Sequence, residues 1–289
     1  MRIVTDSSSD VYRLQEDMPK TKIHVVPLTI TLGDKSYRSG VDIQPRELYQ
    51  MLNETGAFPT TSQPSPGDFV EVYRQLAVDD PDILSIHISS GLSGTVNAAK
   101  TAAEMVPEAN VTIIDTKTLS AGEGWQVWAA ARALDAGWVK ERILDLTERM
   151  SAATETIYTL EDLKYLIHGG RISHIKGLLA SILQIKPLIG VAKQSGVYEQ
   201  LGQARSTKRA IAGLVDVITR KHVPGTALQV QIVQADNPEG AALLREQIEQ
   251  RYECAWLPEA TLSPVLGAHT GPTMVGVIYA AVSALPNVP

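Results

Sequence analysis

The chain has 289 residues but only one cysteine, Cys254, and only two phenylalanines. A lone cysteine excludes an internal disulfide and a metal site built on several thiolates. Aromatic residues make up 5% of the chain, so we expect any apolar pocket to be lined mainly by aliphatic side chains. Positive charge is also in deficit. The formal net charge is −6, which argues against a broad nucleic-acid-binding surface.

Long hydrophobic runs are missing too. No apolar segment approaches the length needed to cross a bilayer, and residues 1–6 lead directly into a strand-like run without the apolar core of a signal peptide. Together with the single cysteine, this predicts a cytoplasmic protein. Hydrophobic residues, at 44%, and charged residues, at 20%, are typical of a globular chain that forms one large domain or two ordinary ones.

One segment organises the rest of the chain. Residues 83–88 form an apolar run of the length of a buried strand, and small residues follow from Ser89 to Thr95. Apolar residues then recur at helical spacing from Val96 to Val106. A loop rich in serine and glycine at a helix start offers free N–H groups, hydroxyls and the positive end of the helix dipole. The segment therefore predicts a binding site for a phosphate or a carboxylate.

The order of elements predicts an α/β fold of two domains. Strands alternate with helices in residues 1–152, which predicts an N-terminal, Rossmann-like domain with a parallel sheet between helices. A hairpin signal among helices in residues 153–289 predicts a second α/β domain with a mixed sheet. Ligands of parallel sheets bind beyond the carboxyl ends of the strands. Asp6, Ser89–Gly94 and Asp115 all fall at such ends.

Two further turns carry groups that suit the same site. Asp6–Asp10 is either the cap of a helix expected over residues 11–16 or part of the lining of the site. Pro59–Gly67 contains three prolines and several hydroxyls, which predicts a stiff, non-helical loop. It is either an ordinary connector or a source of fixed hydroxyls, which lose little entropy when they bind an anion.

Catalysis is one interpretation of these residues. Gly91–Thr95 resembles the turn that carries the nucleophile of α/β hydrolases, although Thr95 stands where a glycine is expected. Ser93, Asp115 and His269 follow in the chain order of such a triad, which would make the protein a serine hydrolase or esterase. The six histidines show no metal-binding spacing, and the sequence has no phosphate-binding loop of a nucleotide-binding protein.

Binding without chemistry is the other interpretation. Ser93, the Gly94 N–H, Thr61 and a histidine would together satisfy a carboxylate. Each charge-assisted hydrogen bond of this kind is worth roughly 1.5–3 kcal/mol. A buried long acyl chain would contribute on the order of 10 kcal/mol, at about 0.8 kcal/mol for each CH₂ group. The tail would therefore dominate the affinity, and the head group would set the orientation.

Seven motifs in order give the sequence a resemblance to the DegV family of fatty-acid-binding proteins, which includes the acyl-carrying subunit of bacterial fatty-acid kinase. They run from residue 5 to residue 272, nearly the whole chain. The motifs are Thr5–Asp10, Pro59–Ser65, Ser90–Thr95, Ile114–Thr116, Gly169–Ser173, Ile185–Pro187 and His269–Pro272.

The resemblance implies two α/β domains with one long-chain fatty acid bound between or beneath them. It also implies that Thr61, Ser93 and the Gly94 N–H hold the carboxylate, with His269 near it. Ser62 belongs to the same motif as Thr61 and is included in the predicted site.

A kinase partner also follows from the resemblance. Many members of the family hand their fatty acid to a separate kinase, which phosphorylates it with ATP. Arg171 matches a family arginine near the head group that would steady the acyl phosphate. Arg205, Lys208 and Arg209 are either a kinase-docking surface or an ordinary solvated helix face.

Two departures from the family pattern bear on the pocket. Ser39 stands where an aspartate is common and is expected to affect only a loop. Thr273 and Met274 are bulkier than the residues usual there, which leaves the preferred acyl chain open. We therefore predict a non-catalytic protein, without cofactor or metal, that presents a fatty acid to a kinase. A serine hydrolase and an interaction protein with an empty cleft are the alternatives.

Overall fold

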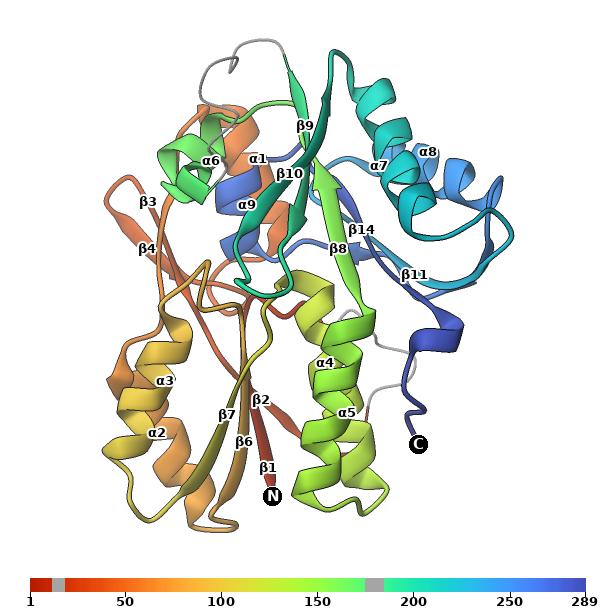
Figure 1. The fold of residues 1–289 in the computed structure, drawn as a ribbon. Coiled ribbons are helices and arrows are strands. Elements are labelled where there is room, and N and C mark those ends of the chain that lie inside the picture. Colours follow the sequence, from red (N-terminus) through yellow and green to blue (C-terminus); the bar gives the residue numbers. More distant parts are fainter. Residues whose placement is uncertain (12–18, 175–184) are drawn as a thin grey trace.

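The computed structural model describes residues 1–11, 19–174 and 185–289. The helix expected over residues 11–16 lies outside the described residues except for Val11. The sequence also predicts a helix around residues 177–184, which lies outside them as well. Within them, the chain forms two large sheets and one small sheet, with helices against both large ones (Figure 1). None of the helices there is long and apolar enough to cross a membrane.

The first sheet is wholly parallel and has the strand order β2-β1-β6-β7. Its strands are β1 (Arg2–Asp6), β2 (Ile23–Val26), β6 (Asp82–His87) and β7 (Asn110–Asp115). Helices cover both faces (Figure 1). One face carries α2 (Pro66–Ala77) and α3 (Thr95–Glu104), and the other carries α4 (Ser120–Asp135) and α5 (Lys140–Ala153). The Rossmann-like prediction for this half is confirmed.

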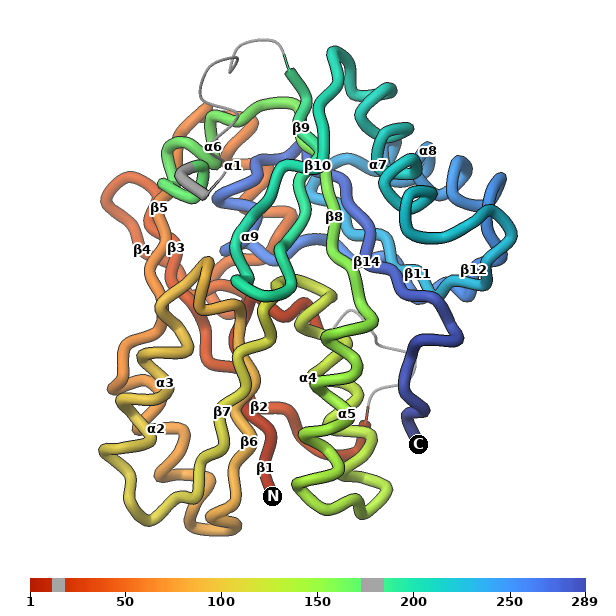
Figure 2. Tube along the Cα trace, in the orientation of Figure 1, coloured from red at the N-terminus to blue at the C-terminus, as the bar shows by residue number. Residues whose placement is uncertain are grey.

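A small antiparallel sheet with the order β4-β3-β5 stands at one end of the parallel sheet (Figure 2). It contains β3 (Thr29–Leu32), β4 (Lys35–Arg38) and β5 (Thr60–Ser62). Pro27, inside a run of strand-forming residues, predicts an edge position or a bulge. The structure has a break there instead, at which the chain leaves the first sheet and enters this one. The stiff loop predicted over Pro59–Gly67 contains β5, in which Thr61 lies opposite Ile30.

The second large sheet is mixed, as predicted, with the order β10-β9-β8-β14-β11-β12. Its strands are β8 (Glu155–Thr159), β9 (Lys186–Val191), β10 (Tyr198–Ala204), β11 (Ala227–Gln234), β12 (Glu253–Trp256), β13 (Ala260–Thr261) beside β11, and β14 (Val275–Ala281). The predicted hairpin is β9 and β10. Two helices, α7 (Thr207–Lys221) and α8 (Pro238–Glu249), cover one face (Figure 1).

The short helices around the second sheet differ most from the prediction. The apolar stripe of Leu160, Leu163, Leu166 and Ile167 predicts a helix that begins at Leu160. The helix, α6 (Lys164–His168), begins later because β8 runs to Thr159 and a bend follows. The other helical elements of the described residues are α1 (Pro45–Thr55), α9 (Pro264–Thr270) and the 3₁₀ turns η3 (Arg171–His174) and η4 (Val282–Ala284). No helix was predicted from the sequence at α9, which carries His269.

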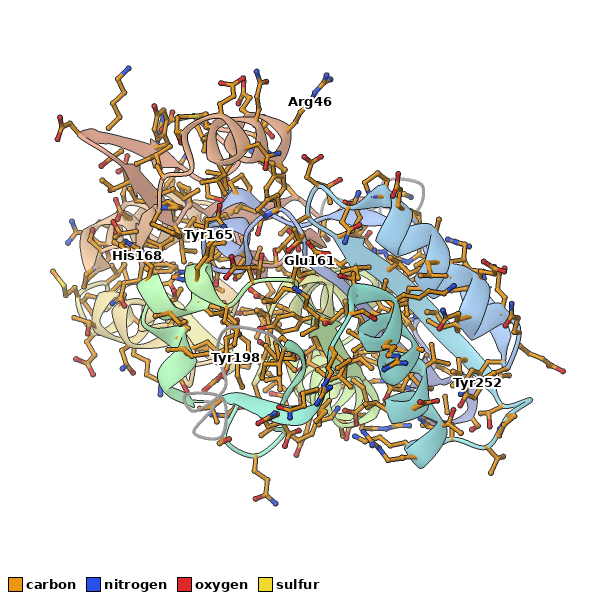
Figure 3. The ribbon with its side chains drawn as sticks, turned by 90° about the horizontal axis from the view of Figure 1, so that it is seen from above. Arg46, Glu161, Tyr165, His168, Tyr198 and Tyr252 are labelled. Carbon is orange, nitrogen blue, oxygen red and sulfur yellow. The ribbon has the colours of Figure 1, made fainter. Side chains whose placement is uncertain are left out.

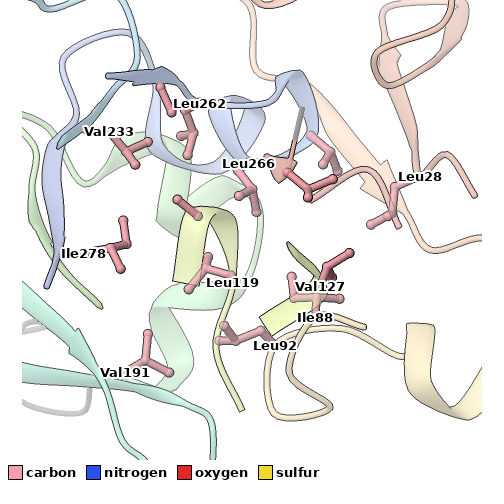
Figure 4. Close-up of a cluster of buried hydrophobic side chains, with 14 of the residues drawn as sticks. Leu28, Ile88, Leu92, Leu119, Val127, Val191, Val233, Leu262, Leu266 and Ile278 are labelled. Carbon is pink, nitrogen blue, oxygen red and sulfur yellow. The ribbon is translucent and has the colours of Figure 1, made fainter. Parts of the chain in front are cut away.

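One apolar cluster joins the two large sheets. Leu119 at the start of α4, Leu266 of α9 and Ile278 of β14 belong to the same buried cluster (Figure 4). A buried hydrogen bond crosses the junction as well: Trp125 Nε1 of α4 donates to Gln231 Oε1 of β11 at 2.6 Å. Gln231 in turn donates from Nε2 to Pro258 O at 2.9 Å. The two halves therefore share this cluster, and each large sheet also has a separate apolar cluster under its own helices.

Candidate functional site

Three segments far apart in the sequence meet beyond the carboxyl end of β6. They are β5, the loop from Ser89 to Gly94 that leads into α3, and α9. The contact that joins the first and the last is a hydrogen bond of 2.7 Å between Thr61 Oγ1 and His269 Nε2. Because β5 pairs with β3, and β3 contacts α9, the small sheet positions both partners of this bond.

Contacts from the first half fix α9 in place. Ser39 Oγ accepts a hydrogen bond from Val265 N at 3.2 Å, and Asp10 Oδ1 accepts one from Ser263 N at 2.9 Å. Both bonds satisfy N–H groups at the start of the helix, which have no partner within it. The expectation that Ser39 affects only a loop is therefore wrong. Ser39 is buried and supports the helix that carries His269.

His269 is a neutral, buried histidine. Only 7% of its surface is exposed. Burial, and to a lesser degree the positive charge of Arg171, lowers the pKa of His269 to about 3 from its usual 6.5. A β-carbon on Gly169 would lie 2.1 Å from His269 Nδ1, so only a glycine at this position lets the ring pack so closely.

The partners of His269 determine which ring nitrogen carries the proton. Among the described residues, Nδ1 is buried and makes no hydrogen bond, whereas Nε2 has Thr61 Oγ1 as its partner. A proton on Nδ1 would leave a buried donor unpaired, at a cost of about 1–3 kcal/mol. The proton therefore belongs on Nε2, which donates to Thr61. The Thr61 hydroxyl keeps its own proton for another acceptor.

The loop that carries Ser93 and Gly94 is held from below by Asp6. Asp6 Oδ2 accepts from Ile88 N at 3.1 Å and contacts His87 Nδ1 at 3.1 Å. The main chain then turns, and Gly94 is the N-cap of α3. Ser93 Oγ lies 2.8 Å from Thr95 Oγ1, and both Ser93 and Gly94 are half-buried. The N–H groups of Leu92 and Ser93 donate to Ser89 O at 3.0 and 3.1 Å, so the loop offers fewer free N–H groups than predicted.

Asp6 belongs to a buried carboxyl network. Ser8 Oγ lies 2.5 Å from Asp6 Oδ1 and 3.0 Å from Glu123 Oε2. The single proton of Ser8 satisfies one contact, and a protonated Glu123 supplies the proton for the other. Burial, reinforced by the charge of Asp6, raises the pKa of Glu123 well above its usual range. Because its carboxyl oxygens are bound within this network, Asp6 supports the loop and does not line the site itself.

Arg171 lies near His269, whereas Ser62 points away from the Thr61–His269 pair. Arg171 Nη1 donates to Gly169 O at 2.7 Å, which keeps the guanidinium near His269. Ser62 is exposed and, as the neighbour of Thr61 on a strand, points to the other face of that strand. The structure therefore brings Arg171 to the site and does not bring Ser62 there.

Helix α6 covers α9 from the outside. Tyr165 and His168 of α6 lie beside α9 in the view from above (Figure 3). The Tyr165 ring occupies the space that a β-carbon on Gly271 would need, and His168 stacks on Phe58 with ring centroids 5.0 Å apart. The Tyr165 ring therefore packs against the end of the helix that carries His269.

The proposed triad residues are used elsewhere. Asp115 accepts hydrogen bonds from Ser90 Oγ at 2.5 Å and from Lys117 Nζ at 2.7 Å. His269 Nε2 pairs with Thr61 Oγ1, and Ser93 Oγ lies 2.8 Å from Thr95 Oγ1, where either hydroxyl can be the donor. In the part of the chain that the structure describes, no group of histidine, cysteine or carboxylate side chains could hold a metal ion.

An apolar cavity of about 20 Å³ lies beneath the site, between α4, α9 and the second sheet. Its wall is mostly aliphatic, in line with the prediction, but it also includes Tyr158, Tyr198 and Met274. Leu119, Leu266 and Ile278 lie around the same space (Figure 4). This volume holds about one water molecule, so a long acyl chain would enter only by moving these side chains apart.

Comparison with known proteins identifies the family. The DegV family model, described as "Uncharacterised protein, DegV family", matches residues 1–282. The chain belongs to the DegV family. A DegV domain-containing protein of Deinococcus radiodurans is 36% identical over 279 residues, which cover 96% of this chain and 94% of that protein.

Solved structures of the same fold include proteins described with a fatty acid. "Fatty Acid Binding of a DegV family Protein from Thermus thermophilus" has a TM-score of 0.81 at 32% identity and covers 98% of this chain and 100% of its own. The Streptococcus pneumoniae fatty acid kinase B3 protein, loaded with linoleic acid, has a TM-score of 0.81 and covers 97% of this chain and 99% of its own. At 20% identity, the second likeness concerns the fold alone.

Proposed function

We propose that this DegV family member binds one long-chain fatty acid without covalent chemistry. The carboxylate lies between Thr61 and the start of α3, where the Thr61 hydroxyl, the Ser93 hydroxyl and the Gly94 N–H donate to it. The acyl chain runs into the apolar cavity between the two large sheets. The fatty-acid-binding relative from Thermus thermophilus supports the ligand class.

The observation that carries this proposal is the bond between Thr61 and a neutral His269. Because His269 Nε2 donates to Thr61, the threonine hydroxyl is left as a donor. A site of hydroxyl and N–H donors at a helix start suits an anion. Arg171 adds a positive charge nearby without pairing directly with the carboxylate.

The two predicted domains divide this work. We assign the head-group residues Thr61, Ser93 and Gly94 to residues 1–152, and His269 with one wall of the cavity to residues 153–289. The break between α5, which ends at Ala153, and β8, which begins at Glu155, supports this boundary.

We also propose that a separate kinase phosphorylates the bound acid with ATP. Arg205, Lys208 and Arg209 are all exposed around the start of α7, and Arg205 and Arg209 line an open groove of about 470 Å³. An exposed basic surface suits an acidic partner surface. Arg171, beside His269, would steady the phosphoryl group.

Native mass spectrometry tests the binding proposal. We expect protein purified from cells to carry one fatty acid, or to take up one equivalent of added palmitic acid. Protein that carries no lipid and takes up none would overturn the proposal. A fluorophosphonate probe tests the hydrolase alternative on the same protein, because only an activated Ser93 would gain the mass of the probe. We expect no adduct.

A further inference from the structure

Gln63 lies over Gly94 at the proposed head-group site. A β-carbon on Gly94 would be 2.0 Å from Gln63 Oε1, 2.6 Å from Cδ and 2.7 Å from Nε2. The whole carboxamide therefore packs against the α-carbon of Gly94. Such a close approach is possible only because residue 94 is a glycine.

The strand β5 explains why this side chain reaches the site. Gln63 directly follows β5 and stands two residues after Thr61. Residues two apart on a strand point to the same face. Thr61 reaches His269 on that face, and Gln63 reaches Gly94. The two side chains thus form one wall that connects α9 with the start of α3.

The carboxamide of Gln63 has hydrogen-bonding capacity to spare. Its nitrogen carries two N–H donors, and the side chain makes no hydrogen bond to any of the described residues. A rotation about the last side-chain bond exchanges Oε1 and Nε2, so either atom can face Gly94. A donor thus stands free beside the groups that would hold a carboxylate.

We propose that Gln63 is a further ligand of the head group, with Nε2–H donating to the carboxylate of the fatty acid. The inference rests on the proposed function. A carboxylate accepts about four hydrogen bonds. Thr61, Ser93 and the Gly94 N–H supply three donors, and Gln63 supplies the fourth. A neutral amide adds this donor without adding charge.

Two substitutions separate the hydrogen bond from the packing. Gln63→Met keeps the length of the side chain and removes its donors, and Gln63→Glu keeps the shape but brings a negative charge to the carboxylate. We expect Gln63→Met to weaken the binding of palmitic acid about tenfold, which corresponds to about 1.4 kcal/mol. We expect Gln63→Glu to weaken it about a hundredfold at pH 8. The affinity for methyl palmitate, which has no charge, will change less than threefold in both variants.

An exposed glutamine outside the site provides the matched control. Gln250→Glu makes the same chemical change at an exposed glutamine directly after α8, far from the site in sequence and fold, and it will leave the affinity for palmitic acid unchanged. Binding of palmitic acid by Gln63→Met and Gln63→Glu at the wild-type affinity would overturn the role of Gln63. If the wild-type protein itself binds no palmitic acid, the proposed function fails instead.

Gly94→Ala gives an independent test. The added methyl group must displace the Gln63 carboxamide, so we expect this variant to lose about as much affinity as Gln63→Ala does. The double variant will lose little more than either single one, because both changes remove the same contact. Fully additive losses would show that Gly94 and Gln63 act separately and would contradict the inference.

Discussion

Thr61 Oγ1 and His269 Nε2 lie 2.7 Å apart although 208 positions separate them in the chain. The bond connects the small sheet of the first half with a helix of the second half. It also determines the direction of hydrogen bonding at the head-group site, because a neutral His269 that donates from Nε2 leaves Thr61 as a donor.

The pair can be tested as a unit. Thr61→Val keeps the shape of the side chain and removes its hydroxyl, so we expect the affinity for palmitic acid to fall about tenfold, with less than threefold loss for the methyl ester. His269→Phe will also weaken the binding of palmitic acid, since Thr61 loses its hydrogen-bond partner. The double variant will lose little beyond Thr61→Val alone. Ser62→Ala is the matched control and will bind as the wild type does. Equal losses for acid and ester, measured by calorimetry, would contradict a role in reading the carboxylate.

The lowered pKa of His269 makes stability depend on pH. The unfolded chain takes up a proton on His269 below its usual pKa of 6.5, whereas the folded protein does so only near pH 3. The contribution of His269 to the free energy of unfolding is therefore fully present above pH 6.5. It declines as the pH falls, by at most about 1.4 kcal/mol for each pH unit. His269→Phe removes this contribution. We expect the difference in unfolding free energy between wild type and variant, from urea titrations, to shrink between pH 7 and pH 5. A constant difference would refute the assignment.

Glu123 has the opposite dependence. Its pKa is raised in the folded protein, so the unfolded chain releases the proton above the usual pKa of 4.5 while the folded protein still holds it. The stability from this group is highest at low pH and declines as the pH rises. Glu123→Gln preserves the shape and the donor to Ser8, and we expect it to gain stability over the wild type between pH 5 and pH 8. The exposed Glu71→Gln variant serves as the control and will show no such gain. A gain that does not change with pH would contradict protonation of Glu123.

The turn of the β9–β10 hairpin packs against the loop from Ser89 to Gly94. Ser89 Oγ donates to Gly196 O at 2.8 Å, and a β-carbon on Gly91 would lie 2.7 Å from Ser195 O. Gly91→Ala must push the hairpin away, so we expect it to lower the unfolding free energy by about 1–3 kcal/mol. We also expect it to weaken the binding of palmitic acid. Gly67→Ala, where only Ser65 Oγ lies nearby at 3.5 Å, will be neutral or slightly stabilising. A Gly91→Ala variant as stable as the wild type would contradict this contact.

Local patterns in the sequence were enough to predict the elements with strong periodicity. The strand over residues 82–87, the serine- and glycine-rich loop and α3 all follow from spacing alone, and so does the β9–β10 hairpin. The helix α9 was missed because it has only seven residues, although Ser263 followed by Pro264 is a typical start signal. The short α6 was predicted too long because Leu160 and Leu163, in the bend after β8, continue its apolar stripe.

The assembly of the site depends on contacts that no local pattern contains. The joint placement of Thr61 and His269 came from the family resemblance, since tertiary packing alone brings β5 and α9 together. Gln63 was missed because β5 is too short to show an alternating pattern. The role of Ser39 was misjudged because its partner, Val265, is more than two hundred positions away in the chain.

The bond from Trp125 to Gln231 has a consequence for how the chain melts. A fragment that ended at residue 152 would leave the indole N–H of Trp125 without its acceptor and expose the aliphatic surface around Leu119 to water. Neither sheet has a complete interior without the other. The protein should therefore unfold in one calorimetric transition, and limited proteolysis at residue 154 should degrade the whole chain without yielding a stable half.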